Sequence, residues 1–124
     1  GYTSQRLHPL LRNRLLPILS NSLVTRPLTE AELAATNFRS ETFLTDTRVL
    51  RFYYRLLRDG DRRRLQIGSR SSVTGADAES PVHLRLLTDA IARKFPPLAG
   101  IDVTHSWWGW VDVSHDMMPR TTQP

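Results

Sequence analysis

Alternation of apolar and polar side chains predicts the clearest element of this chain. From residue 50 onward every second side chain is apolar or aromatic, and Arg51, Tyr53 and Arg55 stand between them. This period of two is typical of a strand with one buried face. Asp59-Gly60 is a turn signal, and alternation resumes after it. We therefore predict a β-hairpin over residues 50–70.

Two helices are predicted from capping signals. Thr29 followed by Glu32 is a capping box, which starts a short helix that ends near Ala35. Ser80-Pro81 starts a second helix that ends before Pro96-Pro97. Its apolar side chains are spaced three and four residues apart, as a buried stripe requires: Leu84, Leu87, Ile91 and Phe95. Outside this stripe, His83 is expected to be exposed and solvated.

Three further strands are predicted at residues 20–26, 42–48 and 103–113. The element order is then β-α-β-β-β-α-β. Because the hairpin is antiparallel, we predict an α+β fold in which a largely antiparallel sheet of about five strands carries two helices on one face. Residues 1–124 are expected to form a single domain.

All three tryptophans of the chain surround one glycine in the last predicted strand. Trp108 and Trp110 point to one face of that strand, and Trp107 and Val111 point to the other. Two explanations remain open. The indoles fill a core, or Gly109 allows another backbone or a flat ligand to approach the strand closely.

Composition narrows the range of partners. The net charge is +5, but the basic residues are dispersed, and their one dense cluster lies at the predicted turn, where arginines are usually solvated. A nucleic acid is therefore not the expected partner. No cysteine is present, which excludes disulfides and thiol nucleophiles and favours the cytoplasm. No apolar stretch is long enough to span a membrane, so no membrane partner is expected.

The sequence contains no recognisable catalytic constellation. Its four histidines are far apart and match no metal-ligand spacing, and neither a G-x-G-x-x-G fingerprint nor a phosphate-binding loop is found. We predict no catalytic residue and no metal site. Tyr53 and Arg55 share one face of their strand and together can bind a carboxylate. The alternative is an ordinary exposed sheet face with a cross-strand charge pair.

Five segments, taken in order, resemble the FAD-dependent D-amino-acid-oxidase-like oxidoreductases, most closely the gamma-glutamylputrescine oxidase branch. They are Gly1-Tyr2-Thr3, PILSNSLVTRPL from Pro17, DTRVLRFYYRLLRDG from Asp46, LQIGSR from Leu65 and WWGWVDVSHDMMP from Trp107. The resemblance covers nearly the whole chain. It implies a fragment of the substrate-binding domain, whose antiparallel sheet covers the flavin, with the FAD-binding domain absent. FAD is then expected in the full-length parent, and neither bound FAD nor turnover is expected in the fragment alone.

The resemblance also implies roles for single residues. Tyr54 matches a family tyrosine that lines the substrate cavity, and Arg70 falls where the sarcosine oxidases have a pocket histidine. Gln66 replaces a lysine near the flavin that assists the reaction with oxygen in those relatives, so this sequence lacks that lysine. Trp108 and Gly109 belong to the W-x-G strand near the flavin. The implied substrate-binding residues are Tyr53, Tyr54, Arg55 and Arg70.

Three hypotheses follow from these observations. In the first, the full-length parent oxidises a primary or secondary amine, or an amino acid, to an imine with FAD as hydride acceptor. In the second, the chain is a standalone basic binding or oligomerisation module without catalysis, and its basic face meets an acidic partner. In the third, the chain is a remnant that forms a homodimer through its exposed sheet.

Overall fold

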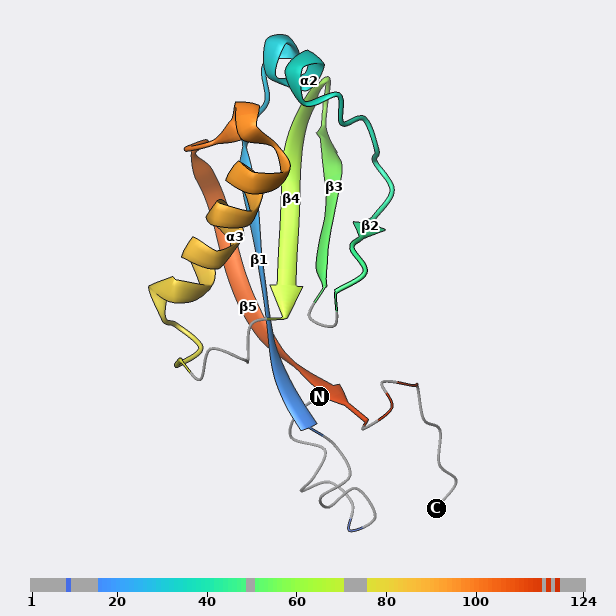
Figure 1. Ribbon diagram of the computed structural model, residues 1–124, viewed down its shortest axis with the longest axis vertical. Coiled ribbons are helices and arrows are strands. Elements are labelled where there is room, and N and C mark those ends of the chain that lie inside the picture. The colour runs from blue at the N-terminus through green and yellow to red at the C-terminus, as the bar shows by residue number, and fades with distance from the viewer. Residues whose placement is uncertain are drawn as a thin grey trace.

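The computed structural model describes residues 9, 16–48, 51–70, 76–114, 116 and 118. One sheet of five antiparallel strands in the order β2-β3-β4-β1-β5 forms the body of the chain (Figure 1). This confirms the predicted α+β fold. The strands are β1 (Leu16–Pro27), β2 (Leu44–Thr45), β3 (Phe52–Asp59), β4 (Arg62–Arg70) and β5 (Val103–Val113). The helices are α2 (Glu30–Thr36), α3 (Pro81–Lys94) and the short 3-10 helix η3 (Pro96–Leu98).

The predicted hairpin is confirmed as β3 and β4. Asp59 pairs with Arg62, and Gly60 between them has a φ of 63°. Glycine adopts this left-handed conformation without the steric cost that a Cβ atom imposes. The turn therefore sets a register in which Tyr53 lies opposite Gly68 and Arg55 lies opposite Gln66.

Both predicted helix starts are confirmed by their caps. The Thr29 hydroxyl accepts from the Glu32 amide at 3.2 Å, and the Glu32 carboxylate accepts from the Thr29 amide at 2.8 Å. The same carboxylate takes two hydrogen bonds from Arg26, at 2.7 and 2.9 Å. The hydrogen bonds from Arg26, assisted by the Thr29 amide, lower the pKa of Glu32 to about 2. Ser80 caps α3, and Pro81 occupies its first turn.

The core lies between α3 and one face of the sheet (Figure 1). Leu23, Leu65 and Ile67 from the central strands are fully buried against Leu87 and Ile91 of the helix. At the end of this face, Leu33 of α2 packs against the same core. The apolar side chains of α2 and α3 that are buried therefore lie on one side of the sheet.

The expected exposure of His83 is wrong. His83 is only 3% exposed, whereas Leu84, expected in the buried stripe, is 38% exposed. The first turn of α3 is rotated by one residue because it is bonded to β1: the Asn21 amide donates to the His83 carbonyl at 3.0 Å. The His83 Nε2 atom lies 2.9 Å from the Asp77 carbonyl oxygen, so Nε2 carries the proton that is donated.

Two strand lengths differ from expectation. The first strand begins four residues earlier than predicted, at Leu16, and the strand predicted at residues 42–48 is reduced to Leu44–Thr45. Asp46 explains the second difference. Its carboxylate accepts from the amides of Arg48 and Phe52 at 3.3 and 3.2 Å, which turns the chain before the strand can continue.

Candidate functional site

The face of the sheet opposite α3 gathers most of the polar candidates, and it is called the open face below. Strand alternation defines it, because Leu23, Ile67 and Tyr54 form one cross-strand row on the α3 side, so their neighbours point away from the helix. No helix in the described part of the chain packs over this face (Figure 1). Its residues include Ser20, Ser22, Tyr53, Arg55, Gln66, Gly68, Arg70, Trp107 and Gly109.

Tyr53 is held in one position by three neighbours on the open face. Its hydroxyl is hydrogen-bonded to the hydroxyls of Ser20 and Ser22, each at 3.0 Å. To reach them from β3, the tyrosine ring crosses over Gly68 of β4. A Cβ atom at Gly68 would overlap the Tyr53 ring and the Ser22 Oγ atom. The glycine is therefore required for this close approach.

Arg55 lies beside Tyr53 in a polar and aromatic setting. Its Nε atom donates to the Gln66 side-chain oxygen at 3.1 Å, and its guanidinium lies 4.1 Å from the centre of the Phe43 ring. The Phe43 ring in turn meets the Tyr53 ring edge-on, with centroids 5.9 Å apart. Within the described residues no partner is found for the two NH2 groups of Arg55. These groups form the fork that binds carboxylates.

Five of the seven residues proposed from sequence share the open face. Arg55 and Gln66 are directly opposed and hydrogen-bonded, and Tyr53 is two residues before Arg55 on β3. Arg70 and Gly109 both lie opposite Ser20, on either side of β1. Arg70 is therefore near the Tyr53 hydroxyl end of the group. A Cβ atom at Gly109 would meet nothing within 4 Å, so this glycine faces open space.

Tyr54 and Trp108 are not brought together with the other five. Tyr54 points to the α3 side, where its ring lies 5.6 Å from that of Phe38 and 5.7 Å from that of Phe95. Lys94 of α3 lies 5.0 Å from the centre of the same ring. Trp108 of β5 lies opposite Asn21 of β1 and also faces the α3 side. Adjacent strand residues point in opposite directions, so neither shares a surface with Tyr53.

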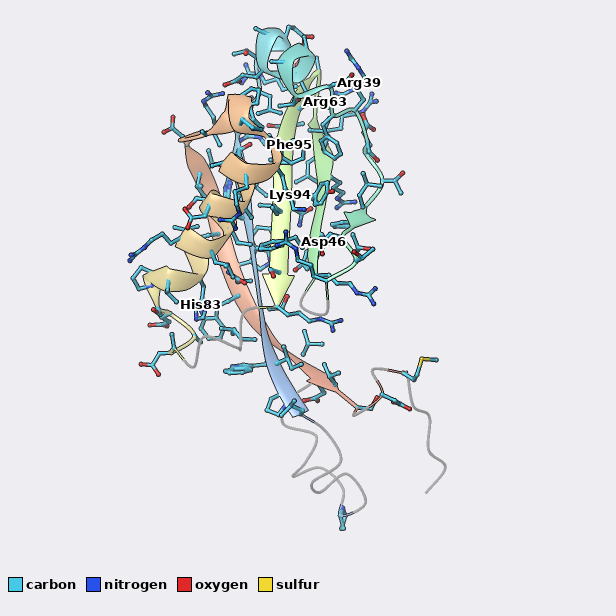
Figure 2. All side chains as sticks on the ribbon, in the orientation of Figure 1. Arg39, Asp46, Arg63, His83, Lys94 and Phe95 are labelled. Atoms are coloured by element: carbon cyan, nitrogen blue, oxygen red, sulfur yellow. The ribbon has the colours of Figure 1, made fainter. Side chains whose placement is uncertain are left out.

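An ion pair between Asp46 and Lys94 closes the α3 side near β2. The two groups are 3.4 Å apart, and both are largely buried (Figure 2). Burial alone would raise the pKa of Asp46, but hydrogen bonds from the Arg48 amide, Lys94 and the Phe52 amide outweigh it, and the pKa is lowered. This ion pair links the segment after β2 to the end of α3, so a structural role accounts for both charged groups.

Three arginines at the hairpin form ion pairs with acidic neighbours. Arg58 and Arg63 both contact the Glu41 carboxylate, at 3.0 and 2.9 Å, and Arg64 contacts Asp59 at 2.8 Å. The hydrogen bond from Arg58 is the main reason that the pKa of Glu41 is lowered. Arg58, Arg63 and Arg64 therefore each have an acidic partner within the chain.

A hollow of the described surface lies between the start of α3 and β5. It measures about 450 Å³ and includes Asn21, His83 and Trp108 in its lining. Ser22 and Trp107 are also part of its lining. Asn21 Oδ1 and His83 Nδ1 are buried without a partner there. The Asn21 atom is an acceptor, because the oxygen of a side-chain amide carries no proton. No arginine or lysine lines the hollow, so we do not place carboxylate binding there.

The described residues contain no group of histidine, aspartate and glutamate side chains that could hold a metal ion. A family model described as FAD dependent oxidoreductase matches residues 1–124. The chain belongs to this family of FAD-dependent oxidoreductases. Neither a curated protein nor a solved structure matches the chain. In the part of this oxidoreductase that the structure describes, no helix has the length and apolar character needed to cross a membrane.

Family membership makes FAD the cofactor of the full-length oxidoreductase. The open face offers the hydrogen-bonding groups of Arg55, Gln66 and Tyr53 on a flat sheet surface, which fits the polar edge of a flavin ring or a substrate. The pyrophosphate does not fit, because the sequence has no glycine-rich loop to bind it. The fit of the described residues to FAD is therefore limited to hydrogen-bonding groups of the kind that its ring requires.

Sequence reasoning missed Ser20, Ser22, Phe43 and Gly68 at this site. One signal was available for Gly68, since an isolated glycine inside a strand marks close approach of another group. The serines and Phe43 had no such signal. Their proximity to Tyr53 and Arg55 depends on the strand order, which places β1 beside β4 and β2 beside β3.

Proposed function

We propose that the open face forms the substrate side of the catalytic pocket of an FAD-dependent oxidoreductase that oxidises an amine or an amino acid to an imine. The observation that supports this most is the grouping of Tyr53, Arg55 and Gln66 on a sheet face that no described helix covers. Among family branches, the ordered segments of the sequence favour that of the gamma-glutamylputrescine oxidases. Small amines and amino acids are the substrates that this pocket would accept.

Each residue has a distinct part in this proposal. Arg55 binds a carboxylate of the substrate through its two NH2 groups, while Gln66 and Phe43 hold the guanidinium in place. Tyr53 presents its phenol at a fixed position and hydrogen-bonds the substrate. The apolar sheet beneath them excludes water from one side. When bound, FAD supplies the electron acceptor for the hydride that leaves the substrate carbon next to nitrogen, as nitrogen loses a proton.

The structure favours Tyr53 over Tyr54 as the substrate-facing tyrosine in this proposal. Tyr54 is packed against Phe38 and Phe95, and its ring serves the core. We keep Gln66 and Gly109 as positions that face the flavin, and Arg70 as a second cation at the same face. We assign Trp108 no role at the flavin, because it points to the α3 side. The absence of cysteine supports a cytoplasmic location for the enzyme.

Spectroscopy of the full-length oxidoreductase tests this function directly. The purified protein is expected to show flavin absorbance, which is bleached under anaerobic conditions by its amine or amino-acid substrate. Arg55→Met is expected to weaken bleaching by amino acids at least about tenfold and to spare amines without a carboxylate. Arg62→Met, on the exposed hairpin, is the matched control and leaves both unchanged. A colourless full-length protein that also fails to take up added FAD would overturn the proposal and favour a binding module.

A further inference from the structure

The hollow between the start of α3 and β5 has two buried polar side chains in its wall. Its volume of about 450 Å³ is within the range of sites for small molecules. Asn21 is 5% exposed and His83 is 3% exposed, and the Asn21 Oδ1 and His83 Nδ1 atoms have no partner. Buried polar atoms of native proteins nearly always have one, so each exception needs an explanation. A ligand that donates a hydrogen bond in the hollow provides one.

The helix start beside the hollow has no backbone donor left for an anion. The first amides of an α-helix have no partner within the helix and often bind anions. Here the Ser80 amide donates to the Asp77 carbonyl at 2.9 Å, and Pro81 has no amide hydrogen. The amides of Val82 and His83 donate to the hydroxyl and the carbonyl of Ser80, at 3.4 and 3.2 Å. The start of α3 therefore does not favour an anionic ligand.

The charge of the wall favours a cation instead. Glu79 is the one charged side chain among the described residues of the lining, and it is exposed and forms no ion pair within the described part of the chain. Asn21 adds an oxygen acceptor, because its Nδ2 atom already donates to the His83 carbonyl at 3.0 Å. A carboxylate and an amide oxygen are acceptors that an ammonium group binds.

Two indoles and two leucines supply the apolar part of the wall. Trp107 is 48% exposed and Trp108 is 43% exposed, and both line the hollow from β5. Indole faces attract ammonium groups. Leu84 and Leu87 line the hollow from α3, and Leu84 is 38% exposed. Acceptors and apolar surface therefore occur together in one hollow.

We propose that this hollow binds a small protonated amine with an apolar body. The ammonium group donates to the Asn21 side-chain oxygen and is attracted by the Glu79 carboxylate, while the apolar body contacts the indoles and leucines. This site goes beyond the proposed function, because Arg55 and Gln66 are not part of its lining.

Titration of the ¹⁵N-labelled 124-residue chain with 2-phenylethylamine, followed by NMR, tests the site. The amine is charged at neutral pH and is expected to bind with a dissociation constant of about 1 mM. The indole N–H signals of Trp107 and Trp108 and the side-chain amide signals of Asn21 are expected to shift. Trp110 is not part of the lining, so its indole signal is expected to shift least. Unshifted Asn21 and Trp108 signals at amine concentrations well above about 1 mM would overturn the proposal and leave ordered water as the partner of Asn21.

Two relatives of this amine separate charge from apolar contact without any change to the protein. 2-Phenylethanol keeps the ring and a hydrogen-bond donor but has no charge, and 3-phenylpropanoate has the opposite charge. At low ionic strength the alcohol is expected to bind at least about threefold more weakly than the amine, and the carboxylate more weakly still. An alcohol or a carboxylate that binds as tightly as the amine would overturn the ammonium assignment.

Substitution of Glu79 tests the charge from the side of the protein. Glu79→Gln keeps the shape of the side chain and is expected to weaken amine binding about threefold while leaving alcohol binding unchanged. Glu30→Gln is the matched control, because it removes the same exposed charge outside the hollow. Unchanged amine binding in Glu79→Gln would overturn the ammonium assignment.

Substitution of Arg55 separates this site from the proposed substrate group. Arg55→Met is expected to leave binding of 2-phenylethylamine unchanged, because Arg55 does not line the hollow. Amine binding that Arg55→Met alters and Glu79→Gln spares would place the amine on the open face and overturn the second site. Because this titration needs no flavin, its result does not depend on whether the full-length protein oxidises amines.

Discussion

The two faces of the sheet differ in what holds their side chains in place. On the α3 side, apolar side chains from three strands pack against one helix, and burial fixes their positions. On the open face, hydrogen bonds and ring contacts hold Tyr53 and Arg55, and both residues remain partly exposed. The same strands therefore provide stability with one set of residues, and we propose that they provide substrate recognition with the other.

This division follows from the period of two along each strand. Leu65 and Ile67 of β4 point to α3, and Gln66 and Gly68 between them point to the open face. Alternate residues of one strand are thus expected to respond differently to substitution. Residues of the α3 side should affect the free energy of unfolding, and residues of the open face should affect the position and chemistry of the polar group.

The largest difference between the faces is expected at adjacent positions of β4. Leu65→Ala removes a side chain that is fully buried and is expected to lower the free energy of unfolding by about 2–5 kcal/mol. Gln66→Ala removes one partner of Arg55 and is expected to cost about 1 kcal/mol or less. Urea unfolding followed by far-ultraviolet circular dichroism measures both. Equal losses for the two variants would contradict the division into faces.

A smaller loss is expected where the open face depends on close packing. Gly68→Ala is expected to cost about 1–3 kcal/mol, because the added methyl group overlaps the Tyr53 ring. Gly109→Ala is the matched control within a strand, since nothing surrounds its Cβ position, and its stability is expected to change little. Urea unfolding is again the measurement.

A double variant identifies the cause of the Gly68 effect. If the overlap with Tyr53 is responsible, Gly68→Ala in a Tyr53→Ala background is expected to cost much less than it does alone. The residual cost reports the second overlap, with Ser22. Full additivity of the two substitutions would mean that the tyrosine ring does not cross over Gly68.

Much of the fold was predictable because its signals are local. The hairpin strands, the capping box of α2, the Ser80 cap of α3 and the strand at residues 103–113 each depend on neighbours in sequence, and all were confirmed, although residue 50 of the predicted hairpin lies outside the described residues. The exceptions depend on contacts that are distant in sequence. Asp46 ends β2 through the amide of Phe52 and the side chain of Lys94, and His83 is buried because α3 is bonded to Asn21.

The candidate site also has one part that follows from local sequence and another part that depends on contacts distant in sequence. That Tyr53 and Arg55 share a face follows from the period of two, and no other information was needed. The serines that hold Tyr53 come from β1, which is adjacent to β4 only in the folded sheet. Strand order is not a local property, so the hydrogen bonds of the tyrosine hydroxyl could not be predicted from the strand itself.

Removal of the Tyr53 hydroxyl tests whether the open face has a polar function. Tyr53→Phe leaves the ring over Gly68 and is expected to cost about 0.5–1.5 kcal/mol, because two serine hydroxyls lose their partner. In the full-length oxidoreductase the same variant is expected to slow flavin reduction at saturating substrate. Stability and flavin reduction that are both unchanged would show that the hydroxyl serves neither purpose.

The smallest effect is expected at the one strong acid–base contact near α2, at the end of the helix-covered side. The pKa of Glu32 is lowered from its ordinary value of 4.5 to about 2, first by the hydrogen bonds from Arg26. Because the folded value lies below the unfolded one, the contribution of Glu32 to stability is complete above about pH 4.5 and is lost as the pH falls toward 2. Glu32→Gln is expected to cost less than about 1 kcal/mol at neutral pH, since Arg26 is partly exposed. Urea unfolding at several pH values is expected to show a weaker acid dependence for Glu32→Gln than for the unmodified chain. An unchanged acid dependence would assign the acid sensitivity to other carboxylates, such as Asp46 on the α3 side, whose pKa is also lowered.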